Sequence, residues 1–158
     1  MESTATSGSS DPAGASSTSG SQGHAGLVEL DREQCLELLA ATTVGRIAVN
    51  LPGWPPVIRP VNYVFDARSQ SVLFRSARGS KLHALLHAAQ AAFEIDGTAS
   101  DGRTAWSVII VGVTEDVTSQ AEIARFEALG LQTWAPVPKP HWVRIRAATV
   151  SGRRIAHP

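Results

Sequence analysis

The chain has 158 residues, a formal net charge of zero and one cysteine, Cys35, which excludes an internal disulfide. Its length suits one ordinary domain, and its balanced charge argues against a general nucleic-acid or anionic-membrane binder. No apolar run is long enough to span a bilayer, so we expect a soluble, cytoplasmic protein with no nucleic-acid or membrane partner.

The N-terminal part differs in composition from the rest. Residues 1–26 are mostly Ser, Thr, Gly and Ala, with almost no side chains to bury. Such a segment cannot offset its own ordering entropy, and it lacks the basic start and apolar middle of a signal peptide. We therefore predict a disordered tail over 1–26 and one folded domain over 27–158.

The domain is predicted to be mainly β. Helical periodicity or capping signals mark three segments, at 30–45, 80–90 and 119–131. Strand character marks six segments, at 45–51, 57–66, 71–76, 91–97, 105–117 and 142–156. The first three strands are joined by short turns, which predicts antiparallel hairpins, and six antiparallel strands in so short a chain close most economically into a small barrel.

Three details of these elements carry structural expectations. Pro60 cannot donate to a β-ladder, so its strand is expected at a sheet edge or bulged at that point. The continuous apolar run in 105–117 predicts burial on both faces. Gly152 is expected to interrupt the last strand, and Ser119 followed by Glu122 predicts a capping box.

Cations gather at one strand-to-helix corner. Between Val44 and Lys81 there are six Lys and Arg residues against one acid, and three of them, Arg75, Arg78 and Lys81, lie in 73–86. Ser80 is a natural helix N-cap, and a bound phosphate would resolve the unfavourable position of Lys81 in the first helical turn. An exposed basic turn with an ordinary serine cap explains the same residues equally well.

The motifs "VGRIAVN", "PPVIRPVNYVFD", "SVLFRSARGSKL", "AAFEID" and "WSVIIVGVTEDV" occur in this order. Over about residues 30–155 the chain thereby resembles the pyridoxamine 5′-phosphate oxidase-like family, the FMN-binding split barrels. The resemblance implies a six-stranded antiparallel Greek-key split barrel with short inserted helices. It also implies a homodimer with two FMN sites at the subunit interface.

The resemblance also implies roles for individual positions. Arg59 would reach the FMN phosphate, the following residues would meet the flavin ring, and the corner residues would hold the phosphate. The start of the long strand would approach the ring, often from the partner subunit. The cofactor-binding residues expected on this basis are Arg59, Pro60, Val61, Asn62, Tyr63, Ser76, Ser80, Lys81, Trp106 and Ser107.

The family's carboxy-terminal Arg motif for pyridoxal phosphate has no convincing match, although Arg153 and Arg154 come nearest. We therefore expect an FMN-dependent oxidoreductase acting on a small molecule other than pyridoxamine phosphate, with no assigned catalytic residue. A non-catalytic protein that binds flavin, a deazaflavin coenzyme or haem is the alternative. His83 and His87 have helical i, i+4 spacing but no third ligand, so no metal is expected.

Overall fold

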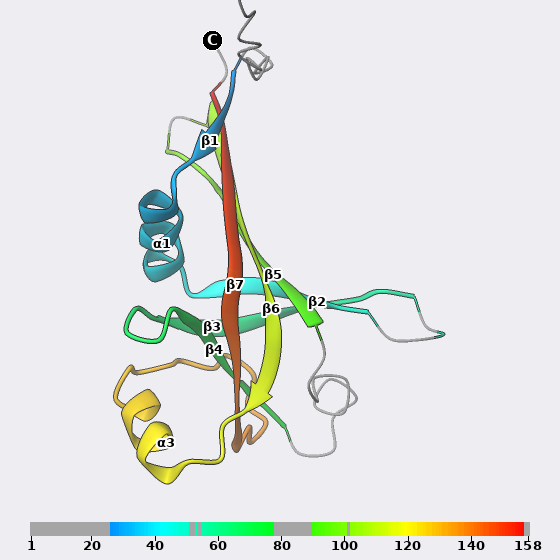
Figure 1. The fold of residues 1–158 in the computed structure, drawn as a ribbon, viewed down its shortest axis with the longest axis vertical. Helices are drawn as coiled ribbons and strands as arrows, with labels where there is room; N and C mark the ends of the chain where they lie inside the picture. Colours follow the sequence, from blue (N-terminus) through cyan, green and yellow to red (C-terminus); the bar gives the residue numbers. More distant parts are fainter. Residues whose placement is uncertain (1–25, 51–52, 54, 78–89, 101, 157–158) are drawn as a thin grey trace, which may run out of the picture.

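The computed structural model describes residues 26–50, 53, 55–77, 90–100 and 102–156. Its helices are α1 (Arg32–Ala41) and α3 (Gln120–Glu127). Its strands are β1 (Leu27–Leu30), β2 (Val44–Val49), β3 (Val57–Asp66), β4 (Ser71–Ser76), β5 (Gln90–Thr98), β6 (Thr104–Asp116) and β7 (His141–Ala156). The long strands β6 and β7 run side by side through the molecule, with α1 and α3 outside the sheet (Figure 1).

All strand pairings are antiparallel, and the sheet order is β1-β7-β4-β3-β2-β5-β6. A further pairing of β7 with β6 joins the two sides, so β2 to β7 form a closed six-stranded barrel. The predicted split-barrel fold is confirmed. The short strand β1 was not predicted; it extends the edge of β7 beyond β4 and includes Leu30, which the sequence pattern had assigned to the first helix.

At Pro60, β3 pairs with only one of the described strands. β3 is inside the sheet, between β2 and β4, rather than at an edge. At Pro60, however, the recorded partner is Arg46 of β2, because the pairing with β4 covers only Tyr63–Asp66. The missing proline N–H is therefore tolerated at a local edge, without a register shift in the β2–β3 pairing.

The prediction that β6 is buried on both faces is wrong. Val108 and Ile110 are fully buried, whereas Ile109, Val111 and Val113 are 41%, 42% and 43% exposed. Successive side chains on a strand point to opposite faces, so one set lines the barrel core and the other lies on its outer surface. The continuous apolar run therefore reflects an apolar outer face on this chain.

The expected interruption at Gly152 is also wrong, because β7 continues through it and pairs there with both Leu30 and Val108. A Cβ at Gly152 would lie 2.6 Å from Cys35 Sγ and 3.1 Å from a Leu30 methyl. The glycine thus lets α1 and β1 approach β7. Cys35 is buried in this contact, and burial raises the pKa of its thiol.

Both described helices begin at side-chain caps, Asp31 for α1 and the predicted Ser119 for α3. The Asp31 carboxylate accepts from Gln34 N at 2.9 Å, and the Gln34 side chain accepts from Asp31 N, which completes a capping box. Ser119 accepts from Glu122 N at 3.4 Å, but the Glu122 carboxylate binds Arg144 at 2.7 Å. Only half of the predicted box on α3 is therefore present, because an ion pair with Arg144 of β7 takes the glutamate.

Two predicted elements lie outside the described residues: the tail, apart from Gly26, and the helix at 80–90, apart from Gln90, which begins β5. Among the described residues, neither helix has the length and apolarity needed to cross a membrane.

Candidate functional site

The predicted phosphate-binding and ring-binding residues of β3, 59–63, lie in the first seven residues of this ten-residue strand. Arg59 is exposed, and its guanidinium donates to the Ile58 carbonyl at 2.8 Å. It forms no ion pair with any acid in the part of the chain that the structure describes. Asn62 is half-buried, and its side-chain oxygen accepts from Trp134 N at 3.0 Å. Arg59 is therefore available to an anionic ligand, whereas Asn62 holds a loop.

Tyr63 occupies the barrel core. Its side chain is fully buried, its hydroxyl donates to the Leu39 carbonyl at 2.8 Å and hydrogen-bonds Thr42, and its ring meets Phe93 edge-on at 4.8 Å. Burial raises the pKa of its phenol to about 12. A ligand outside the core could therefore meet Tyr63 only through its backbone.

The cationic corner is described only in part. Ser76 is buried at the end of β4, opposite His141 of β7. Arg75 precedes it, and its guanidinium lies 5.3 Å from the centroid of the Trp142 ring. Arg78, Ser80 and Lys81 lie outside the described residues.

Trp106 and Ser107 form a second group at the start of β6. Trp106 pairs with Gly97 of β5, and a Cβ at Gly97 would lie 2.6 Å from the indole, which therefore covers the bare glycine backbone. A pocket of about 590 Å³ opens beside these residues, and Asp96, Ser107 and Arg153 also line it. An aromatic wall with polar groups around it suits a flat, polar ligand.

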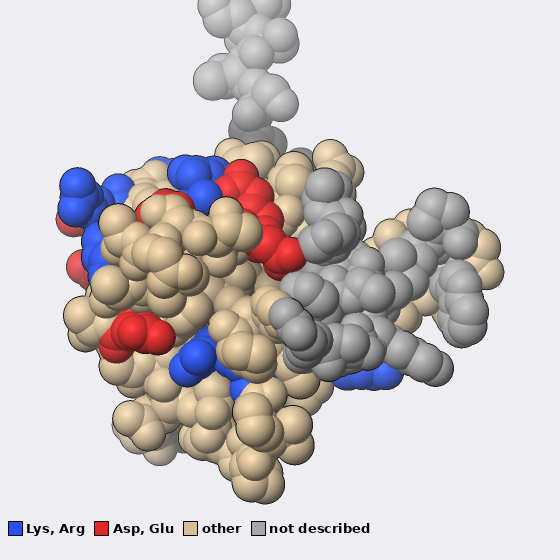
Figure 2. All heavy atoms as spheres, turned by 90° about the horizontal axis from the view of Figure 1, so that it is seen from below, with Lys and Arg blue, Asp and Glu red and all other residues tan. Residues whose placement is uncertain are grey.

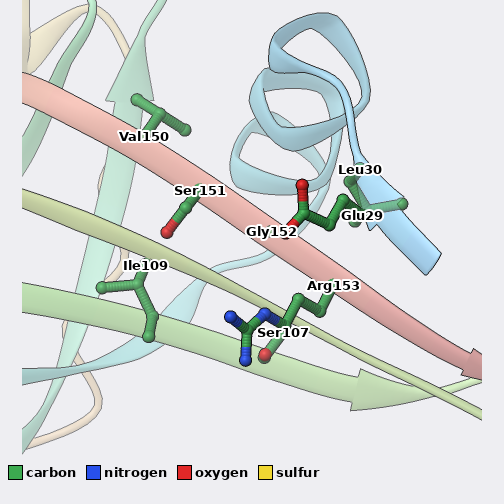
Figure 3. Close-up of a pocket in the computed structure, with 8 residues that line it drawn as sticks. All are labelled: Glu29, Leu30, Ser107, Ile109, Val150, Ser151, Gly152 and Arg153. Atoms are coloured by element: carbon green, nitrogen blue, oxygen red, sulfur yellow. The ribbon is translucent and has the colours of Figure 1, made fainter. Parts of the chain in front are cut away.

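An adjoining pocket of about 410 Å³ shares Ser107 and Arg153 (Figure 3). It lies on the outer face of three strands, with Glu29 from β1, Ser151 from β7 and Ile109 from β6. Arg153 stands in register between Glu29 and Ser107. From the sequence, Arg153 is only a poor match to a family motif, because the register that places it beside Ser107 is not readable there.

The β3–β4 group (Arg59 and Ser76) and the Trp106 group (Trp106 and Ser107) lie on different strands of the barrel. Ser76 pairs with His141, at the end of β7 that also carries Val143, the partner of Asp116. Trp106 lies ten residues before Asp116 on β6, which corresponds to about 33 Å of extended strand. By the other route round the closed barrel, Arg59 pairs with Ile47 of β2, and Ile47 pairs with Phe93 of β5. Phe93 pairs with Ile110 of β6, four residues after Trp106. The two groups are therefore candidate half-sites on different strands of one barrel.

Ion pairs under the barrel hold α3 in place. Arg125 of α3 binds the buried Asp66 at 2.8 Å, and Arg144 of β7 binds both Glu115 and Glu122 at 2.7 Å. Burial alone would raise the pKa of Asp66, but hydrogen bonds from Arg125 and Ser69 outweigh it and lower that pKa. Acids and bases are mixed on this underside, and the visible described surface carries no large patch of one sign (Figure 2). We read these pairs as structural.

The closed antiparallel barrel places the chain in the class of split-barrel proteins, with an exposed arginine on β3 and an aromatic pocket at the start of β6. The family model described as pyridoxamine 5′-phosphate oxidase matches residues 31–154, and the chain belongs to this family.

Three related proteins are informative. The uncharacterised protein Rv0080 of Mycobacterium tuberculosis is 32% identical over 135 residues, which cover 82% of this chain and 86% of Rv0080. The FAD-binding protein of Mycobacterium smegmatis is 32% identical with a TM-score of 0.69, over 81% of this chain and 98% of that one. An FAD-binding protein of Mesorhizobium loti is 25% identical with a TM-score of 0.66, over 82% and 99%.

Proposed function

We propose that this protein is a homodimeric, FMN-binding oxidoreductase that acts on a small molecule other than pyridoxamine phosphate. The observation that carries the proposal is a pair of candidate half-sites on different strands of the barrel, beside an exposed apolar outer face. The β3–β4 group offers cationic and hydroxyl ligands for a phosphate, and the Trp106 group offers a wall for an aromatic ring. Two chains related by a twofold axis would assemble two complete sites.

The available residues fit a flavin phosphate and ring. Arg59 is an exposed arginine whose guanidinium, among the described residues, donates only to a backbone carbonyl, and a guanidinium can bind phosphate through two parallel hydrogen bonds. Trp106 and Ser107 line a pocket large enough to accept part of a flat heterocycle. Flavin, when bound, supplies the hydride or electron transfer, so the protein's residues only need to bind and orient it. The flavin-binding relatives support this assignment.

The outer face of the barrel supports the dimer. Ile58 is 56% exposed on β3, and Ile109, Val111 and Val113 are more than two-fifths exposed on β6. Ala48 pairs with Ile58 and Ala92, and Ala92 pairs with Val111, so these residues form a row across four strands. A contiguous apolar face of this kind marks an interaction surface, and we assign it to a second copy of the chain.

Mixing two defective variants tests the shared site. Arg59→Met removes the phosphate ligand and Trp106→Ala removes the ring wall, so each homodimer should bind FMN weakly. After the two chains are refolded together, half of the dimers are mixed, and each mixed dimer has one intact site. Tight FMN binding should return to about one quarter of the sites, measured by fluorescence titration.

Refolding each variant alone is the control. If mixing restores no tight sites although differently tagged chains exchange, then the site lies within one chain and the shared-site proposal is wrong. A bound flavin absorption spectrum with no reduction by any nicotinamide donor would favour a flavin carrier over an oxidoreductase. The proposal retains the expectation of a cytoplasmic protein, which cell fractionation would test.

A further inference from the structure

A second pocket with a cationic lining lies between β4 and the proline-rich loop that precedes β7. Its volume is about 340 Å³, and it is lined by Arg75, Thr133, Val137, Pro138, Lys139 and Pro140. Two of these residues are cations, and none of the described lining residues is an acid. A concave site with two cations and no counter-charge favours an anionic ligand.

Arg75 is held in place but has an unsatisfied donor. Its guanidinium lies over the ring of Trp142, its cross-strand partner on β7, which restricts the side chain to one side of the sheet. Its Nε atom is buried and has no hydrogen-bond acceptor among the described residues. Arg75 also forms no ion pair with an acid of the described part of the chain. Buried donors normally have a partner, so this site lacks an acceptor that a ligand can supply.

The pocket is separate from the predicted position of the FMN phosphate. Arg75 and Ser76 are neighbours on β4, so their side chains point to opposite faces of the sheet. Leu73, on the same face as Arg75, packs with Trp142 and Phe126 beneath α3. The proline-rich loop is fixed to this side of β3, because Trp134 N donates to Asn62. Arg75 therefore faces the loop, whereas Ser76 faces the barrel.

We propose that the pocket of Arg75 and Lys139 binds a phosphate group that is distinct from the one held by Arg59 and Ser76. Phosphate oxygens accept hydrogen bonds from arginine in pairs and from lysine as a point charge, which matches the two cations present. The group can come from the second phosphate of a flavin dinucleotide, as in the FAD-binding relative, or from a separate phosphate compound. The first source rests on the proposed flavin function, and the second does not.

The test measures binding of inorganic pyrophosphate, FAD and FMN to the full chain by calorimetry. Lys139→Met is the main variant, because Lys139 forms no hydrogen bond or ion pair with the described residues, and Arg75→Met is the second. Arg68→Met removes an exposed arginine in the β3–β4 turn and serves as the matched control. Both pocket variants should weaken pyrophosphate binding by roughly 10- to 100-fold, and the control should not change it.

The three ligands separate the two sources. Loss of FAD affinity with unchanged FMN affinity in the pocket variants supports the site and assigns it to a flavin dinucleotide. Loss of pyrophosphate binding alone supports the site and assigns it to a separate phosphate compound, even if the chain binds no flavin. Pyrophosphate affinity that is undetectable in the wild type, or equal in Lys139→Met and Arg68→Met, overturns the proposal.

Discussion

Gly97→Ala should disturb the candidate ring wall with little effect on the fold. The new Cβ would lie 2.6 Å from the Trp106 ring, 0.8 Å short of the 3.4 Å at which ordinary contact begins. Trp106 is half-buried, so its indole can move away at a modest cost to stability. If the indole stacks on a flavin, its displacement should cost about 1 kcal/mol of binding, or about fivefold in Kd.

A double-mutant cycle separates this effect from a general disturbance of the sheet. FMN affinity is measured by fluorescence titration for the wild type, Gly97→Ala, Trp106→Ala and the double variant. If Gly97→Ala acts only by displacing the indole, it should not change FMN affinity in the Trp106→Ala background. An equal loss of affinity in both backgrounds, or no loss in either, would refute the assignment of Trp106 to the ring.

Three further predictions concern the dimer face, the phosphate ligand and the acid stability. Val111→Lys should convert the dimer to a folded monomer in light scattering, because the interface would bury an unpaired charge, while Leu129→Lys, at an equally exposed position after α3, should remain dimeric. Arg59→Met should weaken FMN by about 1.5–3 kcal/mol in calorimetry, and Arg68→Met should not; equal losses would point to overall charge. Asp66→Asn should lower the free energy of urea unfolding at pH 7 by about 1–3 kcal/mol. The pKa of Asp66 is lower in the folded state than in the unfolded state, so its contribution to stability is present above the unfolded-state pKa and is lost as pH falls through the folded-state pKa. The wild type and Asp66→Asn should therefore converge in free energy of unfolding below about pH 4. A difference between them that does not change with pH would contradict this.

Local pattern was sufficient for most of the barrel. The strands at 57–66 and 71–76 were predicted with the bounds that the structure has, because Pro, Gly and Asp punctuate alternating apolar residues there. Local pattern failed on β6, where Ile109 and Val111 look like core residues but lie outside the barrel. A sequence does not distinguish an apolar residue that faces its own core from one that faces another chain.

The candidate site was predictable as a set of residues but not as an arrangement. Arg59 has the exposure that its predicted role needs, whereas the side chain of Tyr63 points into the core. Arg153 and Glu29 reach the Ser107 pocket only through strand register across β1, β7 and β6. Register depends on pairings between distant segments, which local spacing does not encode.

The position of β7 has a consequence for how the chain matures on the ribosome. β7 is the last described strand to be synthesised, yet it pairs with β1, β4 and β6. Until it emerges, β4 and β6 each present an open edge, and such edges invite pairing with other nascent chains. A truncation that removes β7 should therefore yield aggregates in cells rather than a smaller soluble barrel.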